Sequence, residues 1–272
     1  MHHRFTVGNV EIIALSDAVQ AYPGSAIYPQ AGDALDAYRH YQQDDGGIAL
    51  NFGCFLLRDP ERTILVDTGL GPTENGKLMD ELSGAGASPD DVDAVIFTHL
   101  HPDHTGWNID PDTGKPRFSR ARYLVPGADW GHYSQQQPQP DSFQRDVQPL
   151  MAAGVMDLFD GEHSLSSSSV AVPTPGHTPG HTSIMITSNG ERGCILGDVV
   201  LTPVDAEELA WANSFDWDHE MARATRLRLV DRLINEEIVV GASHLPAPGI
   251  GRFVRLEGRT RWQGFNPSED AS

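Results

Sequence analysis

Cysteine and positive charge are both scarce in this sequence of 272 residues. Its two cysteines, Cys54 and Cys194, are too few for a disulfide framework, which fits a reducing compartment, and we expect a cytoplasmic protein. The chain has 19 Lys and Arg residues against 38 Asp and Glu residues, so its net charge is −19. Because this negative field would repel a phosphate backbone, we expect no nucleic-acid partner.

Long apolar runs are also missing. The longest, at 94–97, 170–172 and 238–240, fall far short of the ~20 apolar residues that cross a membrane, so no membrane partner is expected. Hydrophobic residues make up 39% of the chain and charged residues 21%, which is usual for a protein with a packed core. The chain has no internal repeat and no break in composition, and we predict a single domain over residues 1–272.

Short apolar segments alternate with helical patterns along the chain, which is typical of an α/β protein. The clearest helix is predicted at 218–235, where apolar residues recur every three or four positions: Met221, Ala224, Leu227, Val230 and Ile234. Strands are predicted at 10–15, 48–57, 63–67, 94–97, 122–125, 170–172, 183–187, 194–196 and 238–240.

The predicted strand at 94–97 leads into a polar cluster, Thr98-His99-Leu100-His101-Pro102-Asp103-His104. In α/β folds, ligands bind at the carboxyl ends of strands. His99 and His101 are two residues apart and point the same way if the backbone is extended, whereas Asp103 and His104 follow on a turn and point elsewhere. Imidazole and carboxylate groups in two neighbouring sets are typical of a site for two adjacent divalent cations.

This cluster resembles the HxHxDH signature of the metallo-β-lactamase superfamily. Three further elements follow in the order of that family: a glycine-flanked histidine, His177, an aspartate at a strand end, Asp198, and a last histidine, His244. The resemblance covers about residues 10–244. It implies a four-layer αββα sandwich, in which two mixed β-sheets are flanked by helices.

The resemblance also implies seven metal ligands. One divalent cation would be held by three histidines, His99, His101 and His177. The second would be held by Asp103, His104 and His244, and Asp198 would bridge the two. Zinc is the expected metal, with manganese, iron and cobalt as alternatives for the same ligand types.

Two further residues are predicted to contact these ligands and hold them in place without binding metal themselves. Asp67, at the end of the strand 63–67, resembles the family's supporting aspartate. His181 lies four residues after His177, but Pro179 forbids a helix between them, so we interpret His181 as a supporting residue and not as a ligand.

The ligand types imply a reaction class. The redox-active di-iron branch of the family has Glu where His101 stands, so the hydrolytic branch is favoured. A hydroxide bridging the metals and held by Asp198 would attack a carbonyl carbon, and Asp103 could relay a proton. The predicted protein is therefore a dinuclear, metal-dependent hydrolase that acts on ester bonds.

The region after Asp198 resembles the branch that contains N-acyl-homoserine lactonases and methyl-parathion hydrolases. This implies a small apolar lactone or carboxylic ester as substrate, or a phosphotriester. Leu201 departs from the lactonase pattern, which has a tyrosine three residues after the bridging aspartate to bind the substrate carbonyl. The predicted walls of the substrate pocket are Trp107, Leu201 and Trp211.

The segment at about 16–47 is predicted to be a long loop, because proline and glycine interrupt it. It carries Tyr22, Tyr28, Tyr38 and Tyr41. Two roles are open for it: it covers the metal cleft, or it packs against a second subunit in a homodimer.

Two other functions are compatible with the same seven ligands. One is thioester hydrolysis of the glyoxalase II kind, which would need a basic cluster to bind anionic glutathione. Arginines near the C-terminus are candidates for that cluster: Arg252, Arg255, Arg259 and Arg261. The other is a non-catalytic scaffold that binds metal.

Overall fold

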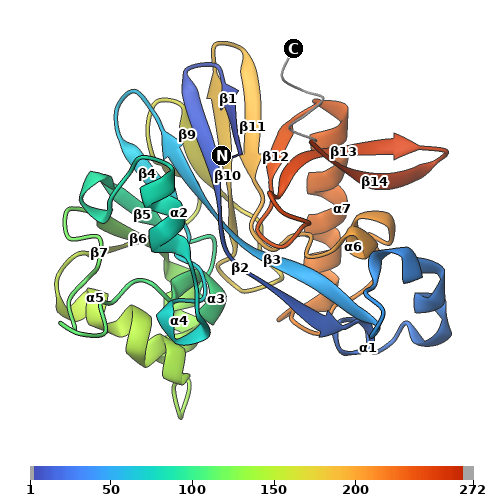
Figure 1. The fold of residues 1–272 in the computed structure, drawn as a ribbon, viewed down its shortest axis with the longest axis horizontal. Helices are drawn as coiled ribbons and strands as arrows, with labels where there is room; N and C mark the ends of the chain where they lie inside the picture. The colour runs from blue at the N-terminus through green and yellow to red at the C-terminus, as the bar shows by residue number, and fades with distance from the viewer. Residues whose placement is uncertain (1–2, 266–272) are drawn as a thin grey trace.

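The computed structural model describes residues 3–265 of the chain, which contain two seven-stranded β-sheets (Figure 1). The first sheet is formed in chain order by β1 (Arg4–Val7), β2 (Val10–Pro23), β3 (Gly47–Arg58), β4 (Thr63–Val66), β5 (Ala94–Ile96), β6 (Arg122–Pro126) and β7 (Met156–Phe159). The second sheet is formed by β8 (His163–Ser164), β9 (Ser169–Pro173), β10 (Thr182–Ser188), β11 (Glu191–Ile195), β12 (Val239–Gly241), β13 (Ile250–Leu256) and β14 (Arg259–Gly264).

Both sheets are mixed. In the first, β1 to β4 are antiparallel to one another, and β4 to β7 are parallel. In the second, β11 and β12 are parallel and the other neighbours are antiparallel. The parallel pairs matter for the site, because the carboxyl ends of parallel strands meet at one edge of a sheet.

Helices lie mainly on the outer faces of the two sheets, and one lies beside them at the far end of β2 and β3 (Figure 1). Those in the first half of the chain are α1 (Gly24–Ile27), α2 (Leu78–Gly84), α3 (Pro102–Thr105), α4 (Gly127–Ser134) and α5 (Gln148–Ala152), with short helical segments η1 (Gly32–Tyr41), η2 (Pro72–Glu74), η3 (Pro89–Asp91) and η4 (Phe143–Val147). Those in the second half are α6 (Pro203–Glu207) and α7 (His219–Asn235).

Alternation along the strands explains the layers. On β3, Leu57 packs between the two sheets, whereas its neighbour Leu56 packs on the opposite face among α2, η4 and α5. On β11, Ile195 faces the first sheet and Cys194 faces α7. Because both faces of each sheet are apolar, each sheet packs against the other sheet on one face and against helices on the other. This arrangement is the predicted αββα sandwich. Cys54 and Cys194 are both buried and unpaired.

The prediction of a long loop at 16–47 is wrong for much of the segment. Strand β2 continues to Pro23 and pairs with β3 as far as Gly47, so the two strands form a long hairpin arm. Helix α1 and η1 fill the tip of this arm. The prediction failed because a bulge between Ser16 and Ala18 interrupts the regular alternation that identifies a strand.

Helix α7 ends as predicted and begins one residue later, after Asp218 as its N-cap, but the predicted apolar stripe does not match its buried face. Met221 and Leu227 are exposed, whereas Arg226 is almost completely buried. None of the helices in the described part of the chain is both long enough and apolar enough to cross a membrane.

Candidate metal centre

Strands β4 and β5 deliver two groups of polar residues to the same edge of the first sheet. Asp67 follows β4 in the left-handed region, with φ of 62°. Its carboxylate accepts hydrogen bonds from the backbone N–H and the hydroxyl of Thr98, both at 2.8 Å, just after β5. These bonds compensate for a strained backbone and fix the point where the histidine cluster begins.

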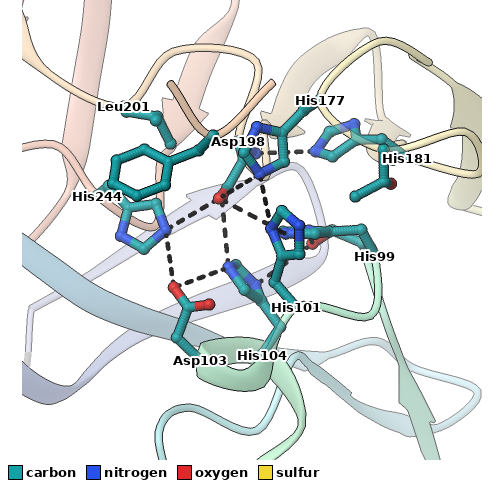
Figure 2. Close-up of polar contacts among 12 residues, drawn as sticks. His99, His101, Asp103, His104, His177, His181, Asp198, Leu201 and His244 are labelled. Atoms are coloured by element: carbon teal, nitrogen blue, oxygen red, sulfur yellow. Dashed lines mark hydrogen bonds and ion pairs between the residues drawn. The ribbon is translucent and has the colours of Figure 1, made fainter. Parts of the chain in front are cut away.

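At the turn into α3, the side chains of the cluster begin to point in two different directions. His101 is the N-cap of α3 and Pro102 occupies its first turn. His101 Nδ1 lies 3.0 Å from His99 Nε2, so these two rings point at one place. Asp103 and His104 lie within the helical turn and point beside it, as the spacing predicted (Figure 2).

The second sheet supplies the other three residues. Asp198 and His244 follow the parallel strands β11 and β12, and His177 lies in the loop between β9 and β10. Asp198 Oδ2 lies 3.2 Å from His177 Nε2 and 3.0 Å from His244 Nε2. His177 Nε2 also lies 3.0 Å from His101 Nδ1, so the residues from the two sheets meet (Figure 2).

Seven side chains therefore form two overlapping groups whose donor atoms lie within 4.8 Å of one another. The first group is His99, His101, His177 and Asp198, and the second is Asp103, His104, Asp198 and His244. Asp198 Oδ1 and His104 Nε2 are buried and have no hydrogen-bond partner among the described residues, and buried polar atoms normally have a partner such as a hydrogen-bonding group or a metal ion. Such a nitrogen and oxygen donor set fits divalent cations.

The outer nitrogens of three buried histidines of the cluster are held by the protein. His104 Nδ1 donates to Asp67 at 2.8 Å, and His244 Nδ1 donates to the carbonyl of Asn51 at 2.7 Å. His177 Nδ1 donates to Asp216 at 3.1 Å. Each of these bonds places the proton on Nδ1 and leaves the Nε2 lone pair facing the cluster.

Three groups that support the cluster were not predicted. Asp216 lies in an irregular segment, Asn51 acts through its backbone carbonyl, and Asp129 lies far from any histidine in the sequence. The buried carboxylate of Asp129 accepts from Leu100 N at 3.1 Å and from Thr178 Oγ1 at 2.9 Å, so it joins the two histidine loops. These three residues are distant in sequence from the residues that they contact, so no spacing pattern in the sequence predicts the contacts.

His181 lies next to the cluster but outside both groups (Figure 2). Its Nδ1 contacts Thr174 Oγ1 at 2.9 Å, and its Nε2 accepts from the backbone N–H of Asp198 at 2.9 Å. Both nitrogens are thus occupied, and His181 holds the backbone that presents the Asp198 carboxylate.

Without metal, the carboxylates of the site are balanced by protons on histidines. Burial alone would lower the pKa of His177, but hydrogen bonds to Asp198 and Asp216 outweigh it and raise the pKa to about 9. Burial is likewise outweighed at His244, where the charge of Asp198 and a hydrogen bond to Asp103 raise the pKa to about 10. Both histidines therefore carry a proton at neutral pH, and a cation that binds here displaces it.

This protonation predicts that the metal-free protein loses stability on the alkaline side. A histidine with a raised pKa stabilises the fold below the pKa of the unfolded chain and stops doing so as the pH passes the folded value. We expect the free energy of unfolding of chelator-treated protein to fall by about 2 kcal/mol or more between about pH 7.5 and pH 9. Urea unfolding at both pH values measures this, with metal-loaded protein as the control. Equal stability of the metal-free form at both would contradict it.

A cavity of about 440 Å³ opens directly above the cluster. Residues of the cluster form its floor, including His101, Asp103 and His244. The walls are mostly apolar: Tyr22, Leu50, Phe52, Leu70, Leu201 and Phe215.

The predicted pocket walls need correction. Leu201 lines the cavity, but Trp107 and Trp211 do not. Trp107 is buried in the core of the first sheet and donates its indole N–H to Asp17 at 2.9 Å. Trp211 packs edge-on against Tyr28 and Tyr38 at the tip of the hairpin arm. The residue type and sequence position of Trp107 and Trp211 thus gave the wrong walls, because half of the wall residues lie on β2 and β3, far from the cluster in sequence.

Two sheets in an αββα sandwich, with a His/Asp cluster at their shared edge, define a metal-binding protein of the hydrolase type. Residues 54–244, more than half of the chain, match the family model for the metallo-beta-lactamase superfamily. The chain belongs to this superfamily and is a metal-dependent hydrolase.

Individual relatives are more distant. An N-acyl homoserine lactonase from Bacillus sp is 26% identical over 215 residues, covering 70% of this chain and 80% of the relative. Metallo-beta-lactamase domain-containing protein 1 from Xenopus laevis is 31% identical over 199 residues, covering 71% and 74%. Among solved structures, AidC, a dizinc quorum-quenching lactonase, has a TM-score of 0.85 at 23% identity, with 97% of each chain covered.

Proposed function

We propose that this protein uses two divalent cations, with zinc the first choice, to hydrolyse small apolar lactones or carboxylic esters, and that phosphotriesters are a secondary substrate class. His99, His101 and His177 would hold one cation, and Asp103, His104 and His244 would hold the other. Asp198 would lie between them. The observation that carries the proposal is the position of Asp198, whose carboxylate belongs to both donor groups and has a buried oxygen with no hydrogen-bond partner among the described residues.

Divalent cations at such a pair of sites supply Lewis acidity and lower the pKa of water from about 15.7 towards about 7. The buried carboxylates and imidazoles around them suit this role, because the cluster offers two negative charges and neutral nitrogen donors. Each buried charge then has an opposite charge in direct contact.

Asp103 is the carboxylate of the site that is best placed to move a proton. Its side chain is 21% exposed and lines the cavity, whereas that of Asp198 is 3% exposed. Asp103 Oδ2 faces His244 Nε2 at 3.3 Å and His104 Nε2 at 3.5 Å. We assign Asp103 the transfer of a proton from the attacking water to the leaving alcohol.

The walls of the cavity support an apolar substrate. Leu50, Phe52, Leu201 and Phe215 present carbon surface to the space above the ligands. Burying a methylene group there contributes about 0.8 kcal/mol, which corresponds to about a fourfold gain in kcat/KM for each carbon that the cavity accommodates. The lactonases among the relatives support a lactone or ester in this cavity.

Thioester hydrolysis of a glutathione conjugate is less well supported. The described lining of the cavity contains no lysine or arginine to meet an anionic peptide. The arginines considered for that role are engaged elsewhere: Arg255 pairs with Asp231, Arg259 and Arg261 pair with Glu207, and Arg252 lies over the ring of Phe265.

A substrate panel on metal-replete protein tests the proposal. We expect hydrolysis of 4-nitrophenyl esters and acylated γ-butyrolactones, with kcat/KM rising with acyl length until the cavity is filled. His101→Ala should lower kcat/KM by about a hundredfold or more, since it removes a donor to one cation. His219→Ala, which removes an exposed histidine at the start of α7, is the matched control and should have no effect. Two bound metals without hydrolysis of any ester, lactone or phosphotriester would favour the scaffold instead.

A further inference from the structure

Tyr22 supplies the only side-chain hydroxyl in the described lining of the cavity. The other wall residues are apolar, and Leu201 offers no hydrogen-bond donor. The floor residues are imidazoles and carboxylates whose donor atoms face one another. A substrate oxygen that enters this cavity therefore meets one neutral protein donor besides the metal site.

The fold brings Tyr22 to this wall through the bulge in β2. After the bulge, Ala18 pairs with Phe52, Gln20 with Leu50 and Tyr22 with Ile48. Residues directly opposite on neighbouring strands share a face of the sheet, and Phe52 and Leu50 line the cavity. Without the extra residue, Tyr22 would lie on the other face of the strand.

Asp17, the bulged residue, is itself firmly held. Its buried carboxylate accepts from Leu70 N and Leu78 N, both at 2.7 Å, and from the indole of Trp107 at 2.9 Å. The position of Tyr22 is thus set by a network in the core and not by a mobile loop.

The ring of Tyr22 is fixed by aromatic neighbours. It packs edge-on against Phe215, with centroids 6.3 Å apart, and is tilted against Phe52 at 6.5 Å. Phe52 in turn packs edge-on against the ring of His244 at 5.2 Å. One chain of aromatic contacts therefore links Tyr22 to the cluster.

The hydroxyl of Tyr22 is kept as a donor. It donates to Gln20 Oε1 at 3.2 Å, and burial, with a smaller effect from the negative charge of Asp103, raises the pKa of the phenol. A turn of the Gln20 amide by 180° would let its N–H donate to the phenol oxygen instead. The phenol O–H is then free for an acceptor in the cavity.

We propose that the Tyr22 hydroxyl, oriented by the amide of Gln20, donates a hydrogen bond to the oxygen of the scissile carbonyl. This inference rests on the proposed function, since it concerns the same substrate. The oxygen gains negative charge as the carbon becomes tetrahedral, so a neutral donor in a largely apolar wall stabilises the transition state more than the bound substrate.

Tyr22→Phe tests the proposal, because it removes the hydroxyl and keeps the ring. We expect kcat to fall about 10- to 100-fold on 4-nitrophenyl butyrate and on N-hexanoyl-homoserine lactone, with KM changed less than about twofold. Gln20→Ala should give a smaller fall in kcat. Tyr41→Phe, which removes a tyrosine hydroxyl of the same segment outside the cavity, should leave kcat unchanged.

A binding measurement separates this inference from the proposed function. In the lactam analogue of the lactone, a ring N–H replaces the ring oxygen and hydrolysis stops. Tyr22→Phe should weaken binding of this lactam to metal-loaded protein about fivefold by calorimetry, with unchanged metal content. Unchanged kcat and lactam affinity, or a rise in KM alone, would overturn the role of Tyr22 while the proposed function stands. If the wild type hydrolyses nothing, the proposed function fails, and unchanged lactam affinity in Tyr22→Phe would overturn the inference as well.

Discussion

Asp198→Asn is expected to lower kcat/KM by about a thousandfold or more, because Asp198 is the one side chain common to both donor groups. The amide keeps the size of the carboxylate but removes its negative charge, so His177 and His244 each lose one of their two carboxylate partners. Loss of a charged ligand also weakens metal binding, so the purified variant should contain less metal than the wild type. Steady-state kinetics and elemental analysis of the same samples measure both effects.

The matched control is Asp146→Asn. Asp146 is also buried, but it pairs with Arg145 away from the cluster, so kcat/KM and metal content should stay near the wild-type values. If Asp198→Asn kept full metal content and activity, the shared carboxylate would have no part in either.

Arg226→Met is expected to lower the free energy of unfolding by about 3–5 kcal/mol, the usual cost of removing one partner of a buried ion pair. The Arg226 side chain is 1% exposed and forms three interactions: with the carbonyls of Val199 and Trp211, both at 2.7 Å, and with Asp216 Oδ2 at 3.2 Å. Methionine fills much of the volume but leaves Asp216 with His177 as its one charged partner and leaves the carbonyls of Val199 and Trp211 without this donor. Urea denaturation of metal-free protein is the measurement.

The same variant should disturb the site through His177, because Asp216 holds its Nδ1. Disturbing a hydrogen bond that orients a metal-binding histidine typically weakens metal affinity about 10- to 100-fold. Competition with a chelator measures this loss of affinity. Arg228→Met, on the exposed side of the same helix, should change stability by less than about 0.5 kcal/mol. A loss below about 1 kcal/mol in Arg226→Met would show that the buried pair contributes little.

Much of the architecture could be predicted from local sequence signals. The apolar segments at 63–67 and 94–97 predicted two strands, which are parallel neighbours in the structure, and the histidines after the second strand predicted a site at its carboxyl end. The αββα arrangement and the positions of His177, Asp198 and His244 came from the family resemblance and not from spacing. The structure brings Asp198 and His244 together because they follow the parallel strands β11 and β12, and His177 joins them from the loop between β9 and β10.

The parts that could not be predicted depend on contacts between distant residues. A buried arginine interrupts the apolar pattern of α7, so the predicted stripe was displaced around the helix. The bulge at Asp17 reverses which residues of β2 face the cavity, so Tyr22 could not be distinguished from the other tyrosines. Trp107 and Trp211 were chosen as walls because of their residue type, yet Asp17 and the tyrosines of the hairpin arm determine where they pack.

The proposed function requires that seven side chains from both sheets hold two divalent cations. Anomalous diffraction at the zinc edge from crystals of zinc-loaded protein locates such cations. Two peaks are expected, one among His99, His101, His177 and Asp198, and one among Asp103, His104, Asp198 and His244. A single peak, or peaks that lie away from Asp198, would contradict this requirement.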